Sequence, residues 1–110
     1  MSEKLTHKKC VPCEGGTKPL TKDESAPYYE QIPSWTMHDK SLEKQFTFGN
    51  FIKAMAFINK VADIAEGEGH HPDIHVFYNK VKLELSTHAI GGLSINDFIV
   101  ASKVDQLTEK

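Results

Sequence analysis

The chain has 110 residues, of which 39% are hydrophobic and 25% are charged, and its formal net charge at pH 7 is -2. This length and balance predict one globular domain with a modest core, and the lack of a basic cluster argues against direct nucleic-acid binding. No apolar run approaches the roughly 20 residues that cross a bilayer, and the amino terminus lacks the apolar segment of a signal peptide, so we expect a cytoplasmic protein without membrane contact.

Residues 1–20 are polar and interrupted by proline and glycine, which predicts an irregular leader before a single domain over residues 21–110. The leader holds Cys10 and Cys13 in a C-x-x-C arrangement, typical of half a zinc site or of a redox pair. No second C-x-x-C follows, and His7 would supply only a third zinc ligand. We favour reduced thiols in a lightly packed leader, with the metal and redox roles as alternatives.

A capping-box pattern from Thr21 to Glu24 predicts a short helix that ends at Pro33, although Pro27 would favour a start near Ser25 instead. Residues 34–48 alternate as two strands around a turn at 38–40, with Lys44 as the one misfit on the apolar side. The strongest helix pattern follows and ends at glycines 67 and 69. Its stripe comprises Phe51, Ala54, Met55, Ile58, Val61, Ala62 and Ala65, extended sideways by Phe57 and Ile64.

Two further strands alternate over residues 74–78 and 81–85, with a tight turn at Asn79-Lys80 and with Tyr78 expected to pack. Ser94 then caps a final helix, with Asp97 three residues later. The order α-β-β-α-β-β-α predicts an α+β, two-layer domain, in which a four-stranded antiparallel sheet carries helices on one face. An exposed edge strand would favour a homo-oligomer.

Four of the six histidines lie between residues 70 and 88. Because a hairpin brings its two outer ends together, His70, His71 and His88 should meet at one end of the sheet, where Asp97 can reach them. His75 has the opposite strand parity and is expected to face solvent. Three imidazoles and a carboxylate suit general acid–base catalysis, and they suit a zinc site equally well.

The spacing of these residues resembles the signature of the pterin-4a-carbinolamine dehydratase family. The matching positions are Glu66-x-x-x-His70-His71-Pro72, then Tyr78, His88 and Asp97 at fixed distances. The likeness extends to residues 9–16 and 19–21, Trp35, Phe46-x-Phe48, the Phe51–Ala65 helix pattern and residues 87–98. The resemblance implies a hydro-lyase that dehydrates a 4a-hydroxytetrahydropterin to quinonoid dihydropterin and water. It would recycle the pterin of an aromatic amino acid hydroxylase and need no metal or organic cofactor.

The resemblance also implies residue roles. His70 and His88 would form the acid–base pair, and His71 would bind and orient the pterin. Asp97, Glu66 and Pro72 would support the site, and backbone near residues 74–77 would meet the hydrogen-bonding edge of the pterin. A homodimer or homotetramer is expected. The alternative is a regulatory or assembly protein of the transcription-coactivator kind with little catalysis.

Overall fold

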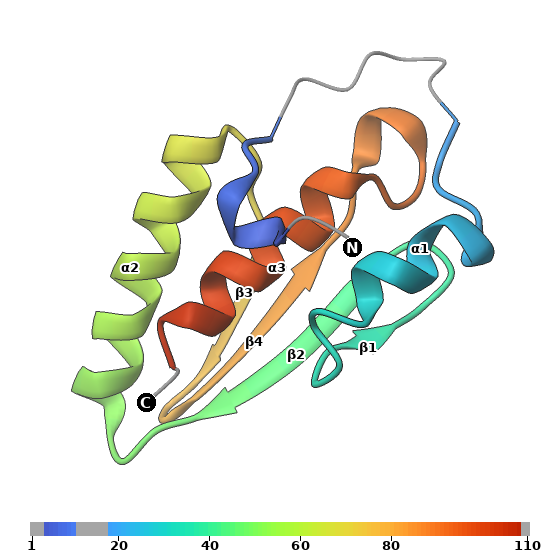
Figure 1. Ribbon diagram of the computed structural model, residues 1–110. Helices are drawn as coiled ribbons and strands as arrows, with labels where there is room; N and C mark the ends of the chain where they lie inside the picture. The colour runs from blue at the N-terminus through green and yellow to red at the C-terminus, as the bar shows by residue number, and fades with distance from the viewer. Residues whose placement is uncertain (1–3, 11–17, 109–110) are drawn as a thin grey trace.

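Four antiparallel strands form one sheet in the order β1-β2-β4-β3, and the helices gather on one of its faces (Figure 1). The computed structural model describes residues 4–10 and 18–108. The strands are β1 (Thr36–Met37), β2 (Leu42–Thr47), β3 (Asp73–Phe77) and β4 (Lys80–Leu85); the helices are α1 (Lys22–Tyr29), α2 (Phe51–Glu68) and α3 (Ile95–Gln106), with 3-10 turns η1 (Leu5–His7) and η2 (His88–Ile90). The predicted α+β class and the two-layer, four-stranded antiparallel sheet are confirmed.

Strand alternation sorts the side chains of β2 and β4 between the two faces of the sheet. Leu42 lies opposite Leu85 and Phe46 lies opposite Val81, and all four side chains are buried beneath the helices. Lys44 shares this inward side, but its Nζ lies 2.9 Å from Asp105 Oδ1 and 4.7 Å from the centre of the Phe46 ring. The misfit in the pattern is therefore a paired lysine whose stem packs against the core.

Helix α2 begins and ends where the sequence predicts. Asn50 Oδ1 accepts a hydrogen bond from Lys53 N at 2.9 Å, and Gly69, at a φ of 66°, ends the helix in the left-handed conformation. Gly67 lies inside the helix and does not terminate it.

The buried stripe of α2 is rotated from the one predicted. Its buried residues are Ala54, Phe57, Val61 and Ala65, whereas Phe51 is exposed. The ring of Phe57 lies 4.7 Å from that of Phe46 and 4.9 Å from that of Phe48. The packing of these three rings turns the Phe57 side of α2 toward the sheet. Phe51, the first residue of the helix, is left exposed.

Helix α1 starts at its capping box despite Pro27. Glu24 N donates to Thr21 Oγ1, and Thr21 N donates to Glu24 Oε1, at 3.1 and 2.9 Å. The alternative start near Ser25 was therefore wrong. Pro27 cannot donate to the carbonyl of Asp23, but both residues are exposed, so water can satisfy that carbonyl; the helix ends two residues later at Tyr29.

The β3–β4 hairpin turns at Tyr78 and Asn79, one residue earlier than predicted. Asn79 Nδ2 donates to the Phe48 carbonyl at 2.9 Å, and the Asn79 carbonyl accepts from Phe48 N at 2.8 Å. Tyr78 has a φ of 55° and is exposed. Its predicted packing beside Ile74 and Val76 was wrong, because the turn takes this residue out of the strand alternation.

Part of the amino-terminal leader is packed against the domain. Leu5 in η1 is fully buried in the core, and its N–H donates to Gln31 Oε1 at 2.8 Å. The expected irregular character of residues 1–20 therefore does not hold at η1. Cys13 lies outside the described residues, so the alternatives for the C-x-x-C pair remain predictions.

Among residues 4–10 and 18–108, no helix combines the length and apolar character that crossing a bilayer requires.

Candidate active site

A cavity of about 370 Å³ lies where the α2–β3 loop meets the β4–α3 loop. In Figure 1 both connections lie at the end of the sheet to which β4 points. The cavity is lined by the leader, the end of α2, both loops and the first turn of α3: Cys10, Glu68, Gly69, His70, His71, Ser86, Thr87, His88, Ala89 and Asn96. His70, His71 and His88 therefore line one cavity, as the pairing of the hairpin strands predicted.

His70 is fixed by a buried carboxylate. Its Nε2 lies 2.6 Å from Asp97 Oδ1, and Asp97 is fully buried, whereas His70 keeps part of its surface at the cavity. When Nε2 donates to Asp97, Nδ1 is the nitrogen left for other partners. A carboxylate in this position holds the ring in one tautomer and stabilises a positive charge on it.

The second oxygen of Asp97 accepts from one backbone N–H and one side-chain hydroxyl. Oδ2 accepts from Ser94 N at 3.0 Å, which completes the capping box of α3, and from Thr87 Oγ1 at 2.8 Å. Thr87 has one hydroxyl proton, which it gives to Asp97, so the 2.7 Å contact between the two hydroxyls must be a donation from Ser94 to Thr87. Asp97 is at once a helix cap and a site residue, one role for each oxygen.

His71 flanks the cavity on the solvent side. Its Nε2 lies 2.6 Å from Glu66 Oε2, with 59% of the His71 side chain and 78% of the Glu66 side chain exposed. His70 and His71 thus take different environments, as expected for neighbouring residues before Pro72. Glu66 contacts the site through His71 and does not line the cavity.

His88 begins the 3-10 turn η2, directly after Thr87. A backbone hydrogen bond of 2.9 Å from Thr87 N to Gly92 O closes the loop, and Gly91, at a φ of 69°, ends the turn. Glycine suits this position, because without a Cβ it adopts a positive φ at little steric cost. The loop presents His88 at the cavity as an exposed side chain.

Cys10 and Glu68 also line the cavity, although the sequence pattern selected Cys10 only as part of the C-x-x-C pair and did not select Glu68. Cys10 N donates to Glu68 Oε1 at 2.8 Å, and Lys103 Nζ donates to Glu68 Oε2 at 2.6 Å. Burial and then the Glu68 charge raise the pKa of Cys10 to about 12. Burial also acts to raise the pKa of Glu68, but the bonds from Lys103 and the Cys10 N–H hold it below the ordinary value.

Other predicted residues lie outside the cavity. His75 is half-exposed on the outer face of the sheet, 3.6 Å from Glu84 Oε1, in line with its predicted solvent position. Pro72 and the β3 residues 74–77 do not line the cavity either. Among residues 4–10 and 18–108, no three His, Cys, Asp or Glu side chains are grouped to hold a metal ion.

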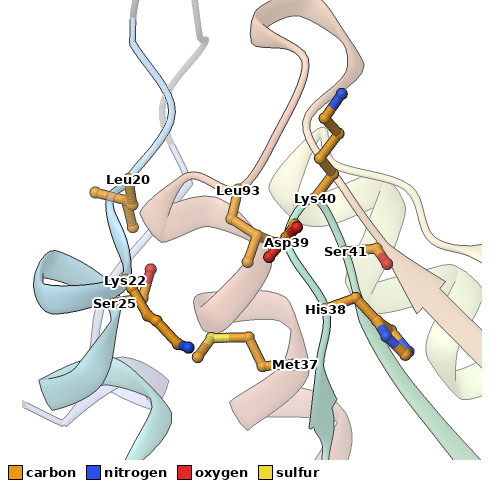
Figure 2. A pocket seen from close by; sticks show the side chains of 9 residues that line it. All are labelled: Leu20, Lys22, Ser25, Met37, His38, Asp39, Lys40, Ser41 and Leu93. Atoms are coloured by element: carbon orange, nitrogen blue, oxygen red, sulfur yellow. The ribbon is translucent and has the colours of Figure 1, made fainter.

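A larger cavity of about 670 Å³ lies between α1 and the β1–β2 turn. Figure 2 shows it flanked by Lys22 from α1, Asp39 from the turn and Leu93 from the segment before α3. Its one histidine, His38, bonds through Nε2 to Glu43 Oε1 at 2.6 Å. We take the smaller cavity as the candidate active site, because it alone of the two gathers three imidazoles and a buried carboxylate partner.

Sequence comparison relates the chain to pterin-4-alpha-carbinolamine dehydratases. A family profile for Pterin 4 alpha carbinolamine dehydratase matches residues 18–107. A protein of Nitrosospira multiformis that provisionally carries the name pterin-4-alpha-carbinolamine dehydratase is 50% identical over 103 residues, which cover 94% of this chain and 91% of the relative. One of Methylococcus capsulatus with the same provisional name is 45% identical over 105 residues, covering 94% and 92%.

Solved structures agree with this placement. A transcriptional coactivator/pterin dehydratase from Brucella melitensis has a TM-score of 0.78 at 26% identity, covering 84% of this chain and 100% of its own. A pterin dehydratase-like protein identified as a RuBisCO assembly factor in the alpha-carboxysome has a TM-score of 0.57 at 25% identity, covering 69% and 88%. With the profile matched from α1 through α3 and the site residues gathered at one cavity, the chain belongs to the pterin-4a-carbinolamine dehydratase family.

Proposed function

We propose that the protein dehydrates a 4a-hydroxytetrahydropterin to quinonoid dihydropterin and water. The observation that carries this proposal is the His70–Asp97 hydrogen bond at a cavity that His71 and His88 also line. The cavity volume of about 370 Å³ falls within the ~300–1,000 Å³ typical of small-molecule sites. Family membership supplies the substrate class.

The reaction needs one acid and one base. The acid protonates the hydroxyl on C4a, the C4a–O bond breaks, and that oxygen leaves as water. The base removes the proton from N5, and the electrons of the N5–H bond form the new N5=C4a double bond. Imidazoles suit both tasks, because an unperturbed histidine titrates near pH 6.5, and such transfers contribute roughly 10²–10⁴-fold to the rate.

We assign the acid–base pair to His70 and His88. His70 can exchange a proton at Nδ1 while Asp97 holds Nε2, which supports a role in which the ring becomes transiently charged. His88 is exposed at the cavity on a loop closed by the Thr87–Gly92 backbone bond. His71, held by Glu66, would orient the pterin. No metal or organic cofactor takes part in this scheme.

We further propose that the protein acts in pterin recycling for an aromatic amino acid hydroxylase and works as a homodimer or homotetramer. The free edge of the sheet supports an oligomer. Strand β3 is exposed along its length, with apolar Ile74, Val76 and Phe77 on it and Tyr78 next to it. An unprotected edge of this kind can pair with the same edge of a second copy.

A second function, in regulation or assembly, draws on the names of the two structural neighbours, a coactivator/pterin dehydratase and an assembly factor. The two functions place different requirements on the cavity. Dehydration requires an imidazole held by a carboxylate, whereas a regulatory or assembly protein does not.

The test is a stopped-flow dehydration assay on enzymatically generated carbinolamine, with quinonoid dihydropterin followed by absorbance. Dehydration clearly faster than in buffer, rising in proportion to protein concentration, supports the enzyme. A rate equal to that of buffer at neutral pH would favour the scaffold.

A further inference from the structure

The segment from residue 4 to residue 10, here called the leader wall, is built into the domain although it lies far from the site in sequence. Leu5 fills the core, and its N–H donates to Gln31 Oε1. Figure 1 shows η1 lying against α3 on the helical face of the sheet. The leader wall therefore has a fixed course before it reaches the cavity at Cys10.

Glu68 fixes the far end of the leader wall. As the last residue of α2, it lies two positions before His70 and its side chain is only 10% exposed. One oxygen accepts from Cys10 N at 2.8 Å and the other from Lys103 Nζ at 2.6 Å. A single carboxylate thus ties together the leader, α2 and α3 beside the candidate active site.

Cys10 brings a small uncharged group to the cavity. Its Sγ donates weakly to the Asn96 carbonyl at 3.7 Å, and the residue lines the cavity together with His70 and His71. Because burial and Glu68 raise the pKa of this thiol to about 12, it stays protonated at neutral pH. Cys10 therefore presents to the cavity a neutral side chain that will not compete with the histidines for protons.

We propose that the leader wall is one side of the substrate site, that Cys10 contacts the bound pterin, and that Glu68 is the positioning residue that holds the wall in place. This inference rests on the proposed function and extends it to residues outside the histidine signature. A fixed wall would exclude water and restrict the pterin to orientations in which C4a and N5 face the imidazoles, which raises the rate by positioning.

The first test uses the reactivity of Cys10 without any ligand. In a Cys13→Ser background, Cys10 is the one remaining thiol of the chain. Glu68→Ala should release the wall and return the thiol toward its ordinary pKa of 9.0. Alkylation by iodoacetamide at pH 8 should therefore accelerate by about 10-fold or more. Glu68→Gln keeps an acceptor for Cys10 N, so its alkylation rate should lie between those of the Cys13→Ser parent and the Glu68→Ala variant. It also provides the test if the alanine variant folds poorly.

The control breaks a comparable ion pair elsewhere. Asp105→Ala removes the partner of Lys44, which bonds Asp105 at 2.9 Å and joins α3 to β2 away from the cavity. Its alkylation rate should match that of the parent. Equal acceleration in the Asp105 and Glu68 variants would mean general loosening of the fold, and no acceleration in either Glu68 variant would mean that Glu68 does not hold the wall; both results would overturn the inference.

The second test adds a stable dihydropterin, with binding followed independently by fluorescence. Saturating dihydropterin should slow Cys10 alkylation by about 10-fold or more, since a thiol in contact with a ligand is shielded. Binding without protection would overturn the leader wall and leave the proposed function intact. Absence of both binding and dehydration would overturn the proposed function and the wall together.

Discussion

His70 and Asp97 are 27 residues apart in the chain, and a hydrogen bond of 2.6 Å joins them. The carboxylate is fully buried and the imidazole reaches the cavity, so the pair connects the interior of α3 with the candidate active site. Because the same carboxylate caps α3 through its other oxygen, the stability of that helix end and the tautomer of His70 depend on one side chain.

Asp97→Asn should damage both functions of this residue. Asn has one acceptor oxygen, whereas the native carboxylate accepts from His70 on one side and from Ser94 N and Thr87 on the other. If the amide oxygen faces Ser94, its NH₂ group faces His70 and forces the other tautomer. We expect turnover to fall by up to about 10²-fold, and urea unfolding to show a loss of about 1–3 kcal/mol.

Asp105→Asn, on the same helix but with Lys44 and Trp35 as partners, is the matched control for turnover. It should lose stability and keep kcat. An Asp97→Asn variant with wild-type kcat would contradict the positioning role of Asp97.

Glu66→Gln should have a small effect. The His71–Glu66 pair is exposed on both sides, and exposed ion pairs contribute roughly 0–1 kcal/mol. We expect an unchanged unfolding free energy within about 0.5 kcal/mol and a KM increase of a few-fold, with kcat close to that of the wild type. A kcat loss as large as that of Asp97→Asn would show that His71 is part of the acid–base machinery.

Glu68 should make stability depend on pH in the acid range. Its pKa in the folded protein lies below the ordinary value of 4.5, so its stabilising bonds are complete above that value and are lost as pH falls through the folded pKa. Glu68→Gln, which does not titrate, should cost about 1 kcal/mol at pH 7.

That difference should hold between pH 7 and pH 5 and shrink below about pH 4. Urea unfolding of both proteins at pH 7, 5 and 3 measures it. A difference that grows toward low pH would contradict the assignment.

Leu5→Ala should destabilise the domain although the residue belongs to the leader. Leu5 is fully buried, and truncation of a buried leucine typically costs about 2–5 kcal/mol. Chemical unfolding measures the loss, and His7→Ala, in the same 3-10 turn, provides a comparison at a site outside the core. A Leu5→Ala variant as stable as wild type would mean that η1 does not pack stably on the domain in solution.

The sequence predicted the features that depend on local pattern. The hairpin between β3 and β4 and the paired order of the strands were enough to bring His70, His71 and His88 to one cavity. The capping box of α3 also placed Asp97 at the correct end of the sheet. Local pattern did not predict that one oxygen of Asp97 bonds His70 while the other accepts from Ser94 N and Thr87, because that depends on the direction of each oxygen.

The misses arise from contacts between distant residues. Phe57 replaced Phe51 in the stripe of α2 because aromatic partners on and after β2 lie against it, and no helical periodicity contains that information. Cys10 and Glu68 are 58 positions apart, and a polar leader broken by glycine gave no sign that it would reach a cavity. Thr87 could have been predicted as a partner of the site from the sequence, because it directly precedes His88 and follows a strand with buried residues.

Histidine acid–base catalysis is tested most directly by comparing the dehydration rates of the His70→Ala, His88→Ala and double variants. The turnover of each single variant should fall by at most about 10²-fold, because either imidazole can partly replace the other. The double variant should lose most of the remaining rate acceleration. His75→Ala, outside the cavity, is the control and should retain full activity. A double variant as active as the wild type would contradict histidine acid–base catalysis at this site.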